Sequence, residues 1–289
     1  MSFEASELIL NADQSIYHLN LHPEDLAETV ILVGDPGRVP KVSAYFDTLE
    51  VEKSRREFVT HTGWYRGKRL SVVSTGIGTD NVDIVLNELD ALVNIDFRKK
   101  KVKENLTRLD LIRLGTSGSI QPDIPVGSIV LSELAIGFDG LLQFYDSGSV
   151  QLADIQFAFL EFSGWSVLKP VPYVVKADPE LCGRLYSEEV VKGFTATNSG
   201  FYGPQGRSLR LELEDPEINQ KLTAFRYRGL RITNMEMETA GIFGLAALMG
   251  HAASAVNCIL ANRPNGTFSS EPARDIDRLI RYTLDKLTS

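Results

Sequence analysis

The sequence has few of the residues that mark a secreted, membrane-bound or nucleic-acid-binding protein. Only two cysteines, Cys182 and Cys258, occur among 289 residues, which is too few for a disulfide framework and lacks metal-ligand spacing. We interpret both as reduced packing residues, which indicates the cytoplasm. Thirty Lys and Arg stand against 38 Asp and Glu, and the net charge of -8 argues against a protein that binds nucleic acid through its phosphates.

Signals for export or membrane insertion are also lacking. Residues 1–10 contain Glu4 and Glu7 and have neither the basic start nor the apolar run of a signal peptide. One stretch without Asp, Glu, Lys or Arg, residues 239–261, has the length of a membrane span. A glycine and a histidine interrupt it, and its halves have helix-like and strand-like patterns. We therefore expect two buried elements there and no membrane association.

What the sequence does contain is an alternation of apolar, strand-like runs with helical patterns. Strands are predicted at 29–34, 58–65, 70–74, 109–114, 128–132, 171–176, 193–198 and 253–261. Helices are predicted from residue 36, over 82–93, 179–191, 216–226, 240–249 and 276–287. This alternation predicts an α/β fold with a largely parallel sheet covered on both faces. No linker or repeat divides the chain, so residues 1–289 are expected to form a single domain; residues 147–168 remain unassigned.

Three predicted strands run into glycine-rich turns. These are Gly34-Asp35-Pro36-Gly37-Arg38, Thr75-Gly76-Ile77-Gly78 and Arg113-Leu114-Gly115-Thr116-Ser117-Gly118. Ligands of open α/β sheets bind beyond the carboxyl ends of the strands, where glycine lets backbone N–H groups approach an oxyanion. Each arginine alone is more simply explained by a surface or ion-pair role. Together, Arg38 and Arg113 predict a phosphate clamp, because a guanidinium offers paired donors that match phosphate geometry.

The second turn also resembles a dinucleotide-binding fingerprint, but Asn81 stands where its third glycine would be. A dinucleotide-dependent oxidoreductase is therefore a weaker alternative.

Further along, Glu236 and Glu238 lie two residues apart between an extended run and an apolar helix. In extended chain both carboxylates project to one face and could serve one site. The alternative is a helix start, where acidic residues interact favourably with the helix dipole.

Taken together, these segments resemble the uridine-cleaving branch of the nucleoside phosphorylase family. The resemblance rests on the three glycine turns and on further motifs in family order, which are Tyr17-His18-Leu19, Arg55-Arg56-Glu57-Phe58, Gln121-Pro122, Val126-Gly127, Glu236-Met237-Glu238 and Asn262-Arg263. It implies a three-layer α/β domain around a twisted mixed sheet, with a homodimer as the minimal active unit and hexamers in bacterial members. The implied enzyme is a pentosyltransferase, a glycosyltransferase of pyrimidine salvage that uses phosphate as nucleophile on uridine.

The resemblance also implies roles for individual residues. The phosphate ligands would be Gly34, Arg38, Arg113 and Thr116, with Arg56 reaching in from the neighbouring subunit. The ribose ligands would be Glu236, Met237 and Glu238, with His18 from the neighbour near the 5′-hydroxyl. The base ligands would be Phe201, which stacks on uracil, with Gln205 and Arg207 on its polar edge. Within these groups, Arg113, Glu238 and Arg207 are expected to carry catalysis.

The base ligands fit the chemistry of uracil. An amide offers a donor and an acceptor together, and an arginine offers donors to the carbonyl oxygens that gain charge as the base leaves. Purine-cleaving relatives place an aspartate where this chain has Asn262 before Arg263, and an asparagine cannot protonate a purine. A purine nucleoside phosphorylase or a nucleosidase of the same fold remains the main alternative. A catalytically silent nucleoside-binding protein is a further one.

No resident cofactor is expected, and inorganic phosphate enters as a co-substrate. Bacterial relatives hold a monovalent cation at the dimer interface near the position of Glu57, but Asn81 replaces a usual serine partner here. The remaining histidines, His22, His61 and His251, have no metal-ligand spacing. We therefore expect no metal catalysis.

Overall fold

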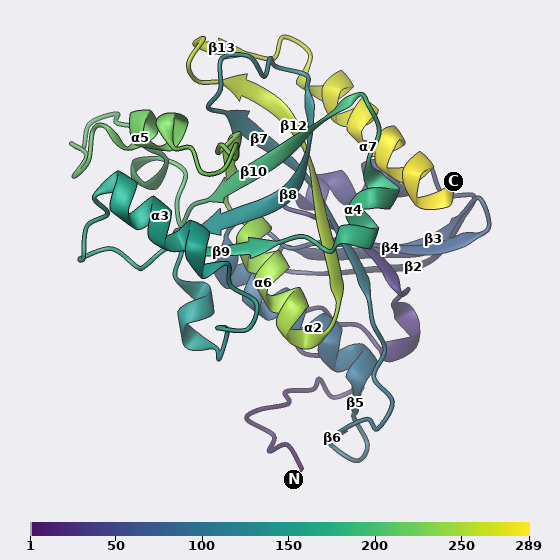
Figure 1. Ribbon diagram of the computed structural model, residues 1–289. Helices are drawn as coiled ribbons and strands as arrows, with labels where there is room; N and C mark the ends of the chain where they lie inside the picture. Colours follow the sequence, from purple (N-terminus) through teal and green to yellow (C-terminus); the bar gives the residue numbers. More distant parts are fainter. Residues whose placement is uncertain (1) are drawn as a thin grey trace.

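Eleven strands join in one sheet in the computed structural model, which describes residues 2–289 (Figure 1). Its strands are β1 (Thr29–Val33), β2 (Thr48–Arg55), β3 (Phe58–Tyr65), β4 (Lys68–Ser74), β7 (Asp110–Ser119), β8 (Ile129–Gly137), β9 (Tyr173–Lys176), β10 (Val190–Thr197), β11 (Asn234–Glu236), β12 (Ala252–Asn262) and β13 (Thr267–Phe268). The helices are α1 (Val39–Ser43), α2 (Thr79–Asn94), α3 (Ala153–Ser163), α4 (Pro179–Leu185), α5 (Ile218–Ala224), α6 (Thr239–Met249) and α7 (Pro272–Thr288). A small separate pair is formed by β5 (Ile95–Asp96) and β6 (Lys101–Val102).

The sheet mixes parallel and antiparallel pairs. Strands β4, β1, β7 and β12 run parallel, as do β8, β10 and β11. The two groups are joined antiparallel, by β11 to β7 and by β12 to β8. These pairings close a circuit of five strands, β7, β12, β8, β10 and β11. Residues near the carboxyl ends of β7, β11 and β12 line one cavity.

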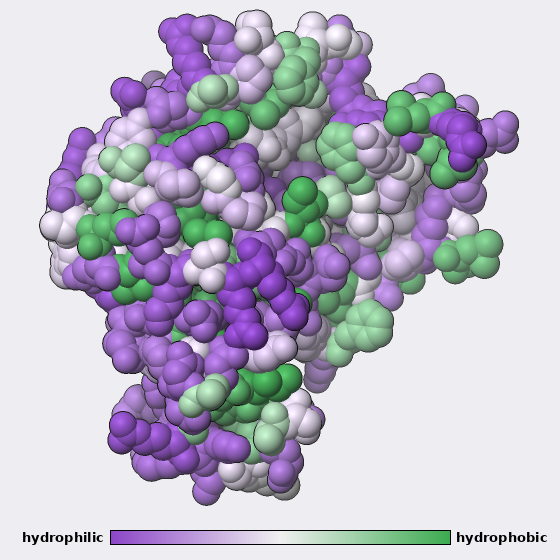
Figure 2. All heavy atoms as spheres, turned by 180° about the vertical axis from the view of Figure 1, so that it is seen from behind, coloured by the Kyte–Doolittle hydropathy of each residue, from purple (hydrophilic) through white to green (hydrophobic). Residues whose placement is uncertain are grey.

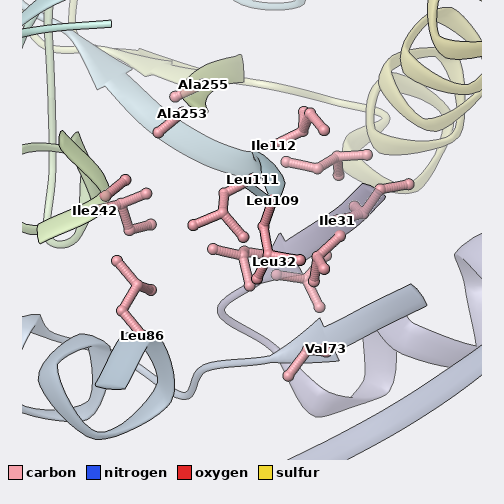
Figure 3. Packing of buried hydrophobic residues seen from close by; sticks show 14 of the residues in the cluster. Ile31, Leu32, Val73, Leu86, Leu109, Leu111, Ile112, Ile242, Ala253 and Ala255 are labelled. Carbon is pink, nitrogen blue, oxygen red and sulfur yellow. The ribbon is translucent and has the colours of Figure 1, made fainter. Parts of the chain in front are cut away.

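Helices cover both faces of the sheet, as predicted. Helices α2 and α6 pack on one another and on one face, while α4 and α7 pack on the other face of β12. Figure 3 shows Leu86 of α2 and Ile242 of α6 pointing towards the strand that carries Leu111. These side chains are fully buried, and burying one such aliphatic side chain contributes about 1.5–3 kcal/mol. Buried aliphatic contacts therefore fix α2 and α6 to this face of the sheet.

The single α/β domain with a twisted mixed sheet is confirmed, but several element predictions are wrong. Residues 115–118 continue β7 instead of forming a turn, because β12 and β11 both pair with them. Helix α4 ends at Leu185, since β10 begins at Val190. The sequence did not predict β2, an edge strand whose residues are all exposed or half-buried. It also did not predict α3 within the unassigned 147–168, where Phe157 and Phe162 are exposed and blur the apolar face.

The face of the molecule that is turned away from the reader in Figure 1 is mostly hydrophilic. Figure 2 shows its apolar residues scattered among polar ones in small groups. Within residues 2–289, no helix has both the length and the apolar character needed to cross a membrane. The apolar stretch considered above as a span forms α6 and β12, two buried elements as expected.

Candidate active site

A cavity of about 1000 Å³ opens at the carboxyl ends of β1, β4, β7, β11 and β12. It is lined by most of the residues that the sequence predicts for a site, namely Gly34, Arg38, Arg113, Thr116, Phe201, Gln205, Arg207, Glu236, Met237 and Glu238. The segments that supply them are far apart in sequence, so the fold brings together what the motifs only suggested. Two predicted residues, His18 and Arg56, do not line the cavity.

Arg38 is a buried cation in this cavity. Its side chain follows the turn after β1, is 7% exposed, and donates from Nη1 to the carbonyl oxygen of Leu114 at 3.2 Å. Burial, and next the charge of Arg113, lower the pKa of Arg38. None of the ion pairs formed within residues 2–289 includes Arg38. A buried charge without a counter-ion is costly, so this position favours an anion from solution.

Arg113 is buried beside Arg38 and is held on one side by acceptors. Its Nη2 pairs with Glu236 Oε2 at 2.9 Å and with Glu238 Oε2, while its Nη1 donates to Asn257 Oδ1. Burial opposes the charge of Arg113, but Glu236 and Glu238 outweigh it and raise the pKa. A guanidinium has five N–H donors. The hydrogen bond to Asn257 uses one on Nη1, and the hydrogen bond to Glu238 uses one on Nη2, which also lies against Glu236 in the ion pair. The Nε–H and one Nη1–H remain for a ligand.

Gly115 has a different role from the one predicted for it. A Cβ atom at this position would overlap the Arg113 guanidinium and crowd Asn257 Oδ1. The glycine therefore makes room for an arginine side chain that folds back along its own strand. Gly76 keeps the predicted turn character, with φ of 74° and no space for a side chain beside Asn81 and Glu57.

The two acidic residues occupy the start of α6 and the site at once. Glu236 accepts from the Thr197 hydroxyl at 2.6 Å and from the backbone N–H groups of Glu238 and Thr239 at 2.9 and 3.0 Å. Glu238 accepts from the Gly78 N–H at 2.9 Å. Burial raises the pKa of Glu238 against the pull of Arg113, and the charge of Glu236 adds to the rise. The pair thus lies at the start of α6, and both carboxylates contact Arg113. Their service in one ligand site stays a prediction.

The predicted base residues form the more open end of the cavity. Phe201 is 51% exposed, and the Arg207 guanidinium carbon lies 3.9 Å from its ring centroid. Arg207 also donates from Nη1 to Gln205 Oε1 at 2.5 Å and to the Phe201 carbonyl oxygen at 2.7 Å. Burial, and next the charge of Arg263, lower the pKa of Arg207 to about 10. One face of the aromatic ring is thus covered by the arginine that was predicted to bind beside it.

Asn262 and Arg263 support this end of the cavity from β12. Asn262 Nδ2 donates to the carbonyl oxygens of Gln121 at 2.9 Å and Ile124 at 2.8 Å, so its amide is used for holding a loop. Arg263 donates to the carbonyl oxygens of Gln205 and Gly206. Both hydrogen bonds of Asn262 need an amide donor, which an ionised aspartate would lack. Arg263 fixes the backbone of the base loop.

Arg56 lies in the turn between β2 and β3, and His18 lies near Phe58 at the start of β3. Arg56 is exposed at that turn with φ of 54°. The His18 ring lies edge-on to Phe58, with centroids 6.2 Å apart, and its Nδ1 lies 2.6 Å from Glu88 Oε1. Neither side chain lines the cavity of its own chain. Their predicted roles in a neighbour's site remain predictions.

The sequence missed several residues that line or support the cavity, and two of them are polar side chains of central strands. Ser117 lines it from β7, and Asn257 on β12 holds Arg113. The sequence did contain a sign that Asn257 makes a specific contact, because it is an amide in the middle of an apolar, buried strand. Such a group needs a partner inside the protein.

The chain is similar to known proteins in sequence and in structure. A family model described as the phosphorylase superfamily matches residues 28–281. The chain is similar to the uridine phosphorylase of Thermococcus kodakarensis, with 31% identity over 87% of this chain and 79% of that protein. It is also similar to the uridine phosphorylase of Escherichia coli, with 29% identity over 86% of each chain. Its structure resembles that of a Trypanosoma brucei nucleoside phosphorylase reported to show uridine phosphorylase activity, with a TM-score of 0.88, 29% identity and coverage of 97% and 99% of the two chains.

Proposed function

The chain belongs to the phosphorylase superfamily, and from this premise we propose that it catalyses the reversible phosphorolysis of uridine to uracil and ribose 1-phosphate. The observation that carries the proposal is the buried guanidinium of Arg38, which has no carboxylate partner and lies beside Arg113. A phosphate dianion would supply the missing counter-charge. The relatives named above act on uridine, and this chain has an amide and an arginine at the expected base site.

Phosphate is the nucleophile in this proposal. Arg38 and the two free donors of Arg113 bind it, together with the turn at Gly34 and the hydroxyl of Thr116. A phosphate oxygen forms a bond to C1′ as the bond from C1′ to N1 of uracil breaks, through an oxocarbenium-like state. The bonding electron pair leaves with the base. Alignment of the two reactants can lower the barrier by about 7–11 kcal/mol.

The acidic residues orient the sugar between the two ends of the cavity. Glu238 accepts hydrogen bonds from the ribose hydroxyls, while Glu236 and Met237 complete the wall of the ribose site. Since Glu236 is already bonded to Thr197 and to the start of α6, it acts chiefly by fixing Arg113. The sugar is thereby held with C1′ facing the phosphate.

The base loop receives the negative charge that develops on uracil. Phe201 stacks on the base, and Gln205 and Arg207 hydrogen-bond its polar edge. Donors aimed at the carbonyl oxygens bind the departing anion more tightly than the neutral base, which lowers the barrier. The Arg207 contact to Gln205 is then exchanged for contacts to uracil.

We also propose an oligomeric state and a cellular location for the protein. His18 and Arg56 act in the site of a second copy, so a homodimer is the smallest active unit. Phosphate and uridine are the ligands, no resident cofactor takes part, and the low cysteine content favours the cytoplasm.

The decisive assay follows uridine absorbance with and without inorganic phosphate. The expected result is conversion only with phosphate, with ribose 1-phosphate as product and inosine as a much poorer substrate. Inosine would leave the donors of Gln205 and Arg207 unmatched, and unmatched buried polar groups discriminate strongly. Cleavage at the same rate without phosphate would make the protein a nucleosidase, and a higher specificity constant for inosine would overturn the base assignment.

A further inference from the structure

A chain of buried polar side chains runs around the five-strand circuit and ends at the cavity on both sides. Its members are Arg113 and Ser117 on β7, Asn257 on β12, Ser132 on β8, Thr195 on β10 and Asn234 on β11. The links after Asn257 are 3.3 Å to Ser132 Oγ, 2.7 Å on to Thr195 Oγ1, 3.1 Å to Asn234 Oδ1 and 2.7 Å to Ser117 Oγ. All the members are buried. Each strand of the circuit contributes at least one of them.

Asn257 is the link that touches Arg113. Its Oδ1 accepts from Nη1, while the carboxylates of Glu236 and Glu238 hold Nη2. A planar guanidinium held at both terminal nitrogens has a fixed orientation in its site. The donors left over, Nε–H and one Nη1–H, then have fixed directions as well.

The amide of Asn257 is itself oriented by the chain. Its Nδ2 donates to Ser132 Oγ at 3.3 Å, so its Oδ1 faces Arg113. Gly115 leaves the space in which the guanidinium and this oxygen meet. Buried hydrogen-bond networks whose members are all satisfied specify one arrangement of side chains.

We infer that Asn257 is a positioning residue, which aims the free donors of Arg113 at the phosphate. The effect of Asn257 on turnover rests on the proposed function. Its effect on the orientation of Arg113 towards an anion does not depend on which reaction follows. Asn257 does not touch the substrates. It acts by preventing Arg113 from rotating towards Glu236 and Glu238.

The test compares three variants. Asn257→Leu removes the acceptor at similar volume, and Ser132→Ala leaves Asn257 in place but frees its amide. The matched control is Ser254→Ala, a buried hydroxyl on the same strand that contacts Cys182 Sγ at 3.3 Å and no member of the polar chain. For each protein, phosphate binding is measured by calorimetry without nucleoside, and KM is measured for phosphate and for uridine separately.

The expected result is a loss of phosphate affinity of about tenfold or more for Asn257→Leu and about threefold for Ser132→Ala, from lost hydrogen bonds to or behind a charged group. The KM for uridine should change by less than about twofold, because uridine contacts are untouched. Ser254→Ala should match the wild type in both. If Asn257→Leu does not fold, Ser132→Ala decides by the same comparison.

Two results would overturn the inference. One is phosphate binding by the folded Asn257 or Ser132 variants that equals the wild type, and the other is a wild-type protein that binds no phosphate. A wild type that binds phosphate but does not cleave uridine would refute the proposed function alone. In that case weaker phosphate binding by Asn257→Leu would still support the inference.

Discussion

The two ends of the cavity are built in different ways. At the end proposed to bind phosphate, the phosphate end, Arg38 and Arg113 are 7% and 6% exposed and are held by strand ends and buried partners. At the end proposed to bind the base, the base end, Phe201 is 51% exposed, and the Arg207 side chain contacts Phe201 and Gln205 of its own loop. The first end is preorganised by the fold, and the second by one loop that Arg263 attaches to β12.

This difference indicates a division of labour. Groups that stabilise charge in a reaction are most effective when they are fixed and dry, as at the phosphate end. A loop with local contacts can exchange them for contacts to a ligand at lower cost. We therefore expect the buried end to carry the chemistry that the family shares. We expect the loop to determine which base the protein accepts.

The largest expected effect comes from removing the unpaired cation. Arg38→Met should lower kcat/KM for phosphate by about 100-fold or more, because a charge-assisted contact to the nucleophile is lost. Steady-state kinetics with varied phosphate measure it. Lys41→Met, which removes an exposed charge on the next helix, is the control and should behave as wild type. Equal values for the two variants would remove Arg38 from the phosphate site.

A second copy of the chain is expected to complete the phosphate end by supplying Arg56. Arg56→Ala and Arg113→Ala should each be nearly inactive, because each lacks one phosphate contact. After subunit exchange, random pairing makes half of the dimers mixed with one intact site of two, so activity should return to about a quarter of wild type. If mixed dimers form and activity does not return, Arg56 does not act in a neighbour's site.

At the base end, Arg207→Met should lower kcat/KM for uridine by about tenfold or more, in part through kcat, and leave KM for phosphate nearly unchanged, since it removes hydrogen bonds to the departing uracil only. Arg210→Met removes an exposed arginine of the same segment and serves as the control. An equal rise in both KM values would contradict the separation of the two ends.

The smallest expected effect concerns the attachment of the base loop. Arg263→Ala removes two donors to loop carbonyl oxygens and should raise KM for uridine by a few-fold, about 1 kcal/mol or less. Unfolding by heat, followed alongside, should change little, because the side-chain hydrogen bonds of Arg263 go to this loop and its backbone bond to Ser119 is kept. A loss in kcat as large as that of Arg207→Met would mean that Arg263 itself contacts the base.

The sequence predicted the phosphate end more completely than its supports. Glycine turns and arginines at strand ends have recognisable spacing, and Gly34, Arg38 and Arg113 lie where expected. Gly115 was misread, because only the folded chain shows that Arg113 bends back over it. Asn257 is 144 residues from Arg113, and their contact depends on the parallel pairing of β7 with β12. Such pairings between distant strands leave no local pattern.

The central claim, that phosphate attacks the sugar, is tested most directly by isotope transfer. The protein is incubated with uridine and phosphate labelled with oxygen-18 in every position, and the sugar product is analysed by mass spectrometry. The account predicts ribose 1-phosphate that retains the whole label, including the oxygen bound to C1′. Free ribose carrying oxygen from unlabelled water would contradict it.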